Sequence, residues 1–515
     1  MQYSKKSIVL CLYVSFLFFL IKKVILLKII IIILHKWVKK IAMKKLPDIT
    51  QDFSGWYNEV IYDAELVDHS PVRGSMVIRP YGYAIWERIQ RILDERIKVT
   101  GHQNAAFPLF IPESFLKKEA SHVEGFAPEL AVVTHAGGKE LEEPLVVRPT
   151  SETIIHYMFA QWIRSWRDLP LKINQWANVV RWEMRPRPFL RTTEFFWQEG
   201  HTAHETAEEA DHEVRTMLQE YIKLAQDYLA VPVVAGFKTE HEKFPGAEYT
   251  MTFEAFMPDG KALQMGTSHF LSQSFAHAFD MKFQNREEKQ SYPYLTSWGT
   301  TTRLVGALVM THGDQKGLVL PPKIAPIQVV IIPIFKSGHD NSVIVIAAQE
   351  LKKNLEKENV RVFIDDEDSK TPGAKFFKWE LKGVPVRIEI GPKDIEKKQV
   401  VVVDRIGLGK NFVSVDTITH HVVTLLDTIQ NYLFEKAQER RKAMWKKSDD
   451  LSIFGPLLEE HGTFYQASWC KDGACETELK NYKATIRCII DSHTFDACFY
   501  CKKPSVVDVL IARSY

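Results

Sequence analysis

The sequence has few cysteines and almost no excess charge of either sign. After Cys11 no cysteine occurs until Cys470, and the remaining five all lie after residue 469. A secreted protein built on disulfides would spread its cysteines along the chain. The clustering therefore indicates one metal site in a reducing compartment. The formal net charge is only +2 over 515 residues, so any contact with nucleic acid needs local basic patches, because no global field attracts it.

The length and composition are those of an ordinary multidomain globular protein. A chain of 515 residues exceeds a single hydrophobic core, and roughly two to four domains are expected. Hydrophobic residues make up 45% and charged residues 25% of the sequence, which is typical of globular proteins that fold in water.

Residues 1–42 differ from the rest of the chain. Ser7 to Ile21 is nearly all apolar, and Val24 to Leu34 is interrupted by a single lysine. A membrane anchor or an uncleaved signal is one interpretation. However, two consecutive lysines separate the runs, each run is short for a membrane span, and no small-residue cleavage site follows. We prefer a start codon assigned too far upstream, with translation beginning at Met43.

The stretch from Arg181 to His201 predicts a hairpin that carries functional groups. Val179 to Glu183 favours a strand, on which Arg181 and Glu183 would share a face. Two prolines then break the ladder, and the run from Phe189 to Glu199 predicts the second strand, after a long basic loop. An arginine fork beside a carboxylate suits a phosphate and an amine. The alternative is an ordinary structural ion pair.

Several other segments have clear periodicity. Helices are expected over Asp48–Glu65, Tyr83–Lys98 and Asp416–Lys447, and alternating strands and helices after residue 326 predict a small α/β domain. Thr150, Ser151 and Glu152 begin a helix, where they could simply form its N-terminal cap or place a carboxylate at the mouth of a site. Pro321 and Pro322 indicate a domain boundary.

Four motifs occur in a fixed order along the chain. They are RPTSE (148–152), RWE with RPFLRTTEFFWQEGH (181–201), QMGTSH (264–269) and SWGTTTR with THGDQKGLVLPP (297–322). Each motif alone is weak, but the four together are specific. The sequence resembles the prolyl-tRNA synthetases, which are class II aminoacyl-tRNA synthetases, over roughly Met43 to Tyr515. The short interval between the second and the last motif resembles the archaeal and eukaryotic-like type, which has no editing insertion.

The resemblance implies the fold class and the domain organisation. Residues 43–322 would form the α+β catalytic domain, a class II synthetase antiparallel sheet flanked by helices. Residues 323–430 would form an α/β anticodon-binding domain. Residues 431–515 would form a connecting helix and a small C-terminal zinc-binding α+β domain.

The resemblance also implies an activity and its partners. The family activates proline with ATP, accompanied by Mg²⁺, and transfers prolyl to the 3′ end of tRNA(Pro) in translation. A cytoplasmic homodimer that does not bind a membrane is expected. Two other functions remain open: a non-catalytic paralogue that binds tRNA or regulates, and a membrane-anchored RNA-binding module, which rests on residues 1–42 alone.

Site residues follow from the family motifs. Arg181, Arg303 and Glu183 are the expected catalytic residues, with Arg181 on the α-phosphate and Arg303 on the γ-phosphate. Proline recognition is expected from Thr150, Glu152, Arg181 and His269, although a buried, hydrogen-bonded structural histidine is the alternative for His269. ATP binding is expected from Arg181, Glu183, Arg191, Glu194, Gln264, Thr267, Thr301 and Arg303.

Two further sites are expected towards the C-terminus. Cys470, Cys475, Cys498 and Cys501 have spacings that suit a tetrahedral zinc ion, which in the family is structural. Cys488 would be a small core residue. The segment from Phe376 to Asp394 resembles the anticodon-binding surface, where Glu380 and Arg387 are the candidates for reading bases. Ion pairs within the domain are the alternative for these two residues.

Overall fold

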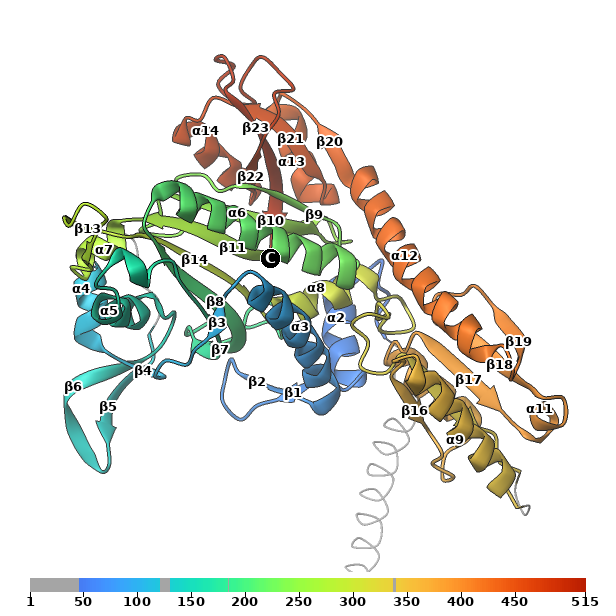
Figure 1. The fold of residues 1–515 in the computed structure, drawn as a ribbon. Helices are drawn as coiled ribbons and strands as arrows, with labels where there is room; N and C mark the ends of the chain where they lie inside the picture. The colour runs from blue at the N-terminus through green and yellow to red at the C-terminus, as the bar shows by residue number, and fades with distance from the viewer. Residues whose placement is uncertain (1–45, 121–129, 184, 337–339) are drawn as a thin grey trace, which may run out of the picture.

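The computed structural model describes residues 46–120, 130–183, 185–336 and 340–515. The leader, residues 1–42, therefore lies outside the described residues. Two bodies are visible in Figure 1: a large sheet with its helices, and a smaller domain around β15 to β19, joined by the long helix α12 (Ile418–Met444).

An eleven-stranded sheet forms the larger body, and its central strands are antiparallel. Its order is β20-β21-β23-β22-β9-β10-β11-β14-β8-β7-β3. This is the antiparallel sheet expected of a class II synthetase catalytic domain. The strands of its catalytic part are β3 (Gln103–Asn104), β7 (Leu171–Val180), β8 (Glu194–His204), β9 (Val233–Phe237), β10 (Tyr249–Phe256), β11 (Lys261–Ser272) and β14 (Tyr294–Thr301).

Helices cover the sheet and form the main core with it. α6 (Ala207–Lys223) packs across β11 and β14 and continues into the π-helical turn η2 (Leu224–Tyr228), while α3 (Pro80–Val99) packs on α6. α2 (Phe53–Asp63) and α8 (Arg303–His312) complete this layer. α3 begins three residues before the expected Tyr83, because Pro80 fits the first turn of a helix.

Smaller elements surround this sheet. A hairpin of β5 and β6 projects from one end of the molecule (Figure 1). These elements are β1 (Val67–His69), β2 (Met76–Ile78), β4 (Phe110–Pro112), α4 (Glu113–Ala120), β5 (Val132–Ala136), β6 (Lys139–Val147), α5 (Glu152–Trp162), η1 (Trp166–Asp168), α7 (Ser274–Ala278), β12 (Phe283–Gln284) and β13 (Gln290–Ser291).

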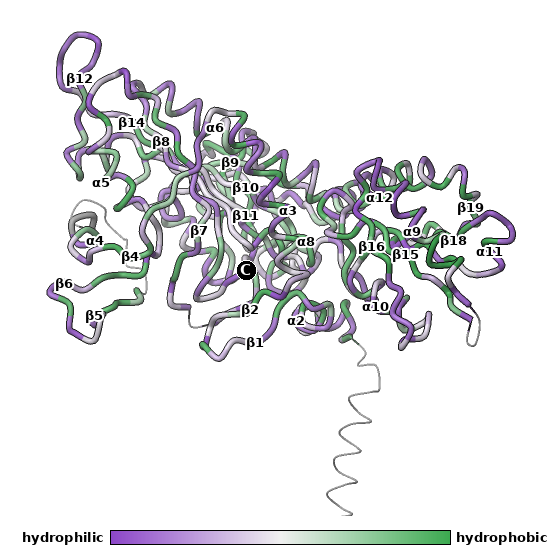
Figure 2. The backbone as a smooth tube through the Cα atoms, turned by 60° about the horizontal axis from the view of Figure 1, so that its bottom comes forward, coloured by the Kyte–Doolittle hydropathy of each residue, from purple (hydrophilic) through white to green (hydrophobic). Residues whose placement is uncertain are grey.

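The second domain is a mixed sheet with the order β16-β15-β17-β18-β19, as its α/β pattern predicts. Its interior is hydrophobic, with Val329 to Ile332 fully buried, and Figure 2 shows the apolar stretches around β15 and β18. The elements are β15 (Val329–Pro333), α9 (Ser342–Lys357), β16 (Val362–Ile364), α10 (Pro372–Leu381), β17 (Val386–Ile390), α11 (Pro392–Glu396), β18 (Gln399–Asp404) and β19 (Lys410–Ser414).

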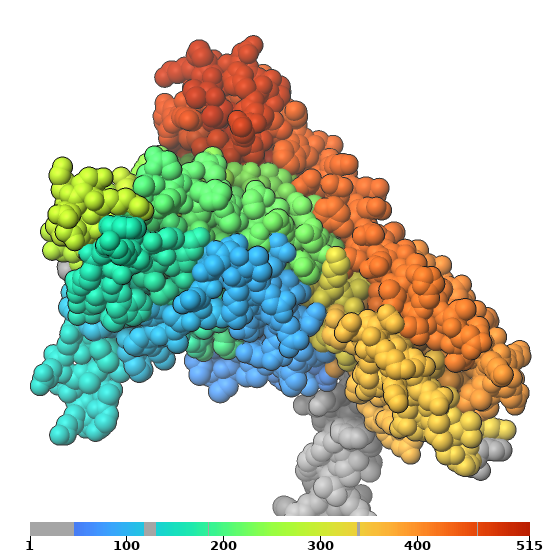
Figure 3. All heavy atoms as spheres, viewed as in Figure 1, coloured from blue at the N-terminus to red at the C-terminus, as the bar shows by residue number. Residues whose placement is uncertain are grey.

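The C-terminal residues extend the catalytic sheet instead of forming a detached unit. β22 joins β9 through Ile489 and Phe237, and β23 runs parallel to the start of β11, with Arg513 opposite Lys261. Figure 3 shows the C-terminal part (red) in direct contact with the catalytic part (green). The elements are β20 (Trp445–Lys447), α13 (Leu451–His461), β21 (Phe464–Trp469), α14 (Gly473–Thr477), η3 (Glu478–Tyr482), β22 (Thr485–Ile490) and β23 (Val507–Ser514).

The expected strands of the Arg181 hairpin are wrong at their inner ends. β7 ends at Val180 and β8 begins at Glu194, so Arg181 and Glu183 lie in the loop and not on a strand. The ladder stops because the Thr193 amide donates to the carbonyl of Gly74 at 2.9 Å, outside the hairpin. The long helix is also shorter than expected: α12 ends at Met444, because the next three residues form β20 on β21.

Candidate active site

A cavity of about 930 Å³ opens on the catalytic sheet. Its walls come from the helix after β6, the β7–β8 loop, β11 and the end of β14. All the residues expected to bind proline or ATP line this cavity except Glu194. The carboxylate of Glu194 instead accepts a hydrogen bond from the Asn178 amide at 2.7 Å. Four stretches that are far apart in sequence thus meet at one place.

The first end of the cavity carries a buried carboxylate. Glu152 is the first residue of α5, is 4% exposed, and accepts a hydrogen bond from the Thr150 hydroxyl. The N-terminal cap of the helix is Ser151, whose side chain makes no capping bond; it donates to Glu199 at 2.5 Å. The side chains of Thr150 and Ser151 therefore bond to carboxylates and do not cap the helix.

Arg181 lies beside this carboxylate and is held rigidly. Its Nε donates to the carbonyl of Pro149 at 2.9 Å. Its guanidinium lies 5.7 Å from the ring centre of Phe195 and 5.5 Å from that of Trp197. Burial lowers the pKa of Arg181, and the charges of Glu152 and Glu199 oppose that effect. A preorganised cation such as this one can bind a phosphate without rearrangement.

His269 projects from β11 into the same cavity. Its Nδ1 is hydrogen-bonded to the Thr250 hydroxyl and its Nε2 to the Thr267 hydroxyl, each at 2.9 Å. The ring of Phe244 lies 4.6 Å away. Burial, together with the charge of His201, lowers the pKa of His269 to about 3. The imidazole is therefore neutral near pH 7, and both of its nitrogens already have hydrogen-bond partners. It contributes to the shape of the cavity and adds no charge.

Arg303 marks the other end of the cavity, at the start of α8. Its Nε donates to the carbonyl of Leu190 at 3.1 Å and its Nη1 to the carbonyl of Gln264 at 3.0 Å. Burial lowers its pKa to about 10, which leaves it a cation at neutral pH. The hydroxyl of Thr301 accepts from the Arg303 amide at 3.0 Å and fixes the turn into the helix.

The loop between β7 and β8 contributes an ion pair at the cavity rim. Glu183 pairs with Arg191, whose side chain is 65% exposed, and also accepts the amide of Arg185 at 2.8 Å. The ion-pair partner of Glu183 is therefore Arg191 and not the Arg181 of the expected strand pair, and Arg191 can reach solvent or a ligand.

Glu199 and His201 are among the polar residues of the cavity that were not predicted from the sequence. Glu199 accepts from Ser151, from the Gln175 amide at 2.8 Å and lies 3.1 Å from Nε2 of His201. Burial by itself would lower the pKa of His201, but the hydrogen bond to Glu199 and the nearby carboxylates raise it overall. The sequence does contain a signal for these residues. Trp197, Glu199 and His201 are spaced two apart, so they share one face of β8 and point into the cavity together.

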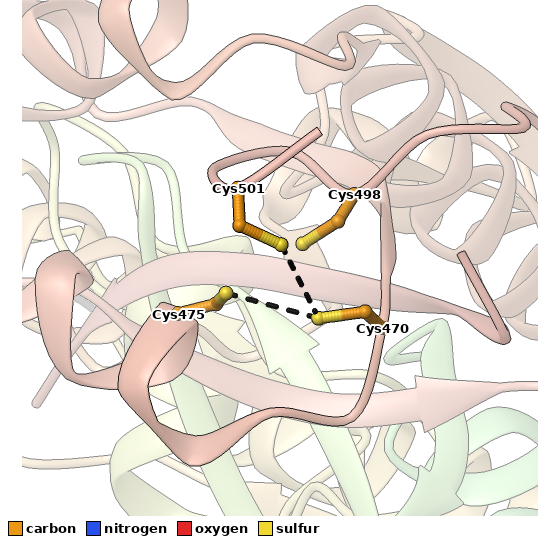
Figure 4. Close-up of side chains that lie close together, drawn as sticks. All are labelled: Cys470, Cys475, Cys498 and Cys501. Carbon is orange, nitrogen blue, oxygen red and sulfur yellow. Dashed lines mark hydrogen bonds between the residues drawn. The ribbon is translucent and has the colours of Figure 1, made fainter. Parts of the chain in front are cut away.

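The four predicted cysteines converge in the C-terminal part (Figure 4). Their sulfur atoms lie within 4.8 Å of one another, with 3.7 Å between Cys470 and Cys475 and 3.6 Å between Cys470 and Cys501. Zinc–sulfur bonds of about 2.3 Å in a tetrahedron put sulfur atoms about 3.8 Å apart, so the donor set fits zinc. Cys488 is fully buried in a separate apolar cluster.

Glu380 and Arg387 both have ion-pair partners. Glu380 accepts from Lys316 at 2.9 Å, and Arg387 pairs with Glu389 at 3.0 Å. The Arg387 guanidinium also lies 4.2 Å from the ring centre of Phe376. The ion-pair alternative is thus present for both residues, and for Glu380 the partner, Lys316, lies four residues after the end of α8.

Across the described ranges, none of the helices is both long enough and apolar enough to cross a membrane.

Comparison with known families divides the chain into three parts. Residues 133–312 match the tRNA synthetase class II core domain (G, H, P, S and T), residues 328–425 match an anticodon binding domain, and residues 451–515 match the prolyl-tRNA synthetase C-terminal domain.

Individual proteins match over nearly the whole chain. Proline–tRNA ligase 2 of Clostridioides difficile (strain 630) is 50% identical over 93% of this chain and 99% of its own length. Prolyl-tRNA synthetase from Cryptosporidium parvum, solved with halofuginone and AMPPNP, superposes with a TM-score of 0.87 at 43% identity, covering 91% of this chain and 99% of that one. The same enzyme solved with L-proline and AMP superposes with a TM-score of 0.86 at 42% identity, covering 92% of this chain and 99% of that one.

Proposed function

The chain belongs to the proline–tRNA ligase family, and we propose that the cavity on its sheet is where it makes prolyl-adenylate. It is an aminoacyl-tRNA ligase that activates proline with ATP and transfers it to tRNA(Pro). The observation that carries the residue assignment is that Arg181, Glu152, His269 and Arg303 meet around one cavity.

Both chemical steps are displacements that need no enzyme nucleophile. In the first, a carboxylate oxygen of proline attacks the α-phosphate of ATP, and pyrophosphate leaves. In the second, the terminal ribose hydroxyl of the tRNA attacks the carbonyl of the adenylate, and AMP leaves. The protein contributes positioning and charge stabilisation. Arg181 stabilises the charge that develops at the α-phosphate, and Arg303 holds the γ-phosphate.

Proline recognition is assigned to the end of the cavity around Glu152. Its carboxylate, oriented by Thr150, accepts a hydrogen bond from the ring ammonium of proline. Neutral His269 closes the pocket with Phe244. Because His269 carries no charge near pH 7, it does not repel that ammonium.

The nucleotide occupies the remaining part of the cavity. Glu183, Arg191, Gln264, Thr267 and Thr301 line it there, and Glu194 supports the loop from outside through Asn178. ATP enters with Mg²⁺ on its phosphates. Within the described part of the chain, the cysteine cluster is the one group of three or more potential ligands. When present with ATP, Mg²⁺ would neutralise part of the charge on the phosphates, and phosphate oxygens would be among its ligands.

Zinc is assigned to Cys470, Cys475, Cys498 and Cys501. When bound, it would supply a structural cross-link between α14 and the segment before β23, since four protein ligands leave no open position for catalysis. The anticodon is assigned to the smaller domain, residues 323–430, with Arg387 stacked on Phe376 as the stronger of the two candidates.

The remaining proposals concern the whole chain. Residues 43–322 form the catalytic domain and 431–515 the connecting helix with the zinc-binding domain. The protein works in the cytoplasm as a homodimer.

Pyrophosphate exchange tests this function. We expect ATP–pyrophosphate exchange that depends on proline, and charging of tRNA(Pro) with proline. A non-catalytic paralogue would bind tRNA without exchange, and that result would overturn the assignment.

A further inference from the structure

Three buried charges form a compact cluster beneath the nucleotide end of the cavity. Nζ of Lys238 lies 2.9 Å from Oε1 of Glu254 and donates to the carbonyl of Arg487 at 2.9 Å. Arg487 donates to the same carboxylate through Nε at 3.2 Å and through Nη2 at 3.0 and 3.2 Å. The Glu254 side chain is 0% exposed and that of Arg487 is 6% exposed. This bidentate pair is closed off from water.

The cluster joins two domains. Glu254 lies on β10 of the catalytic sheet, and Lys238 directly follows β9. Arg487 lies on β22, so it is supplied by the C-terminal part, which rests on the catalytic part in Figure 3. A buried ion pair contributes little stability over an apolar contact of the same volume. Stability alone therefore does not account for this cluster.

The backbone links Glu254 to the nucleotide site. Glu254 is the direct partner of Gln264 across the β10–β11 ladder, and the carbonyl of Gln264 accepts from Arg303. The β10–β11 ladder shifts register at this point and leaves Met265 as an extra, bulged residue. The Thr300 hydroxyl donates to the carbonyl of Met265 at 2.8 Å. Such bulges re-aim groups beside active sites.

Arg303 itself is bonded to neutral groups only. Its described hydrogen bonds go to the carbonyls of Leu190 and Gln264, and no described carboxylate lies within ion-pairing distance. Burial lowers the pKa of Arg303, the charge of Glu254 opposes that effect, and nearby arginines, Arg487 among them, add to it. Glu254 thus stabilises the cation through space while its own oxygens are occupied by Arg487 and Lys238.

We propose that Glu254 and Arg487 are positioning residues for ATP. Arg487 holds the Glu254 carboxylate away from Arg303, so that the Arg303 guanidinium keeps a nearby countercharge and still has its donors free for the phosphates. The C-terminal part of the chain thereby takes part in nucleotide binding. The inference rests on the proposed role of Arg303.

The test separates a positioning role from a structural one. Arg487→Met removes the bidentate partner of the Glu254 carboxylate and leaves only Lys238 and the Thr252 hydroxyl on it. The carboxylate can then shift towards Arg303 and compete with phosphate, so the KM for ATP in pyrophosphate exchange should rise about tenfold, as expected for coupled neighbours. The KM for proline should stay near wild type. Adding Glu254→Gln removes the competing charge, so the double variant should bind ATP better than Arg487→Met alone.

Three results would overturn the inference: an unchanged KM for ATP in folded Arg487→Met, equal rises for ATP and proline, or a double variant at least as impaired as the single one. Lys483→Met is the matched control, because it removes an exposed cation of the same domain and should leave both KM values unchanged. Zinc content and melting temperature report folding.

A conservative variant decides the question if Arg487→Met does not fold. Arg487→Lys keeps the buried charge but replaces the bidentate fork by a point charge, so the KM for ATP should rise about threefold; no rise would overturn the inference. Arg303→Ala is measured alongside. If that variant exchanges normally, the role of Arg303 itself fails; if it is impaired while the Arg487 variants are normal, only this inference fails.

Discussion

The catalytic cavity and the cysteine cluster organise their polar groups in opposite ways. In the cavity, each functional side chain is held by other protein groups: Arg181 by Pro149 and two rings, and His269 by two threonine hydroxyls. In the cluster, four sulfur atoms face one another around a common centre. The cavity residues are therefore positioned by contacts with the protein, whereas the cysteines face a common centre that a metal ion would fill. A change in the cavity should affect the chemistry, and a change in the cluster should affect the fold.

The largest expected effect is the loss of the metal. We expect one zinc per chain, and Cys498→Ser should lose it, because three thiolates do not complete the site. Binding of structural zinc is worth on the order of 10 kcal/mol of folding free energy, so the C-terminal part should melt earlier. Metal analysis and thermal unfolding check this.

Cys488→Ser is the matched control for the metal site. Cys488 lies in a separate apolar cluster, and its variant should keep the zinc. Loss of zinc from Cys488→Ser together with its retention in Cys498→Ser would mean that the four ligands are assigned wrongly.

Removal of a phosphate-binding arginine should come next. Arg181→Ala and Arg303→Ala should each lower adenylate formation at least about a hundredfold, as the loss of a preorganised charge contact does. Zinc content should stay at one per chain, which distinguishes this effect from the previous one. Exchange near the wild-type rate in either variant would remove that arginine from the reaction.

A smaller effect, confined to tRNA, is expected in the anticodon-binding domain. Glu380→Ala and Arg387→Ala should leave pyrophosphate exchange near wild type and lower tRNA charging about tenfold, at roughly 1–3 kcal/mol per lost base contact. Thermal unfolding controls for the ion pairs that both residues make. Unchanged charging would show that these residues only form ion pairs, and equal losses in both assays would indicate a folding defect.

Removal of residues 1–42 should have no effect. A protein that begins at Met43 should be dimeric and as active as the full chain, because the cavity is lined by described residues from Thr150 to Arg303. Size-exclusion chromatography and exchange kinetics test this, together with N-terminal sequencing of the native protein. Detection of Met1 or Gln2 in the native protein, or an inactive shortened chain, would refute the start-codon interpretation.

The sequence was informative where function fixes residues in a short motif. Thr150, Glu152, Arg181, His269 and Arg303 could be named because their motifs occur in a fixed order, and all of them line the cavity. Glu199 was missed because the sequence of its strand gives no sign of the residues that bond to it. Those partners come from β7 and from the segment before α5.

Long-range contacts were beyond the sequence. The Thr193 amide donates to the carbonyl of Gly74, and this bond ends the hairpin early. The sequence around either residue gives no sign of the contact. Arg487 and Glu254 are 233 positions apart, and no periodicity connects them. The continuation of the catalytic sheet into β22 and β23 likewise depends on backbone pairing between distant segments.

The most direct test of the account is a crystal structure of this protein with proline and a non-hydrolysable ATP analogue. We expect the proline amine at Glu152, the α-phosphate at Arg181 and the γ-phosphate at Arg303, with little movement of Arg181 or His269 from the positions described. Nucleotide bound outside this cavity, or proline at the Arg303 end, would contradict it.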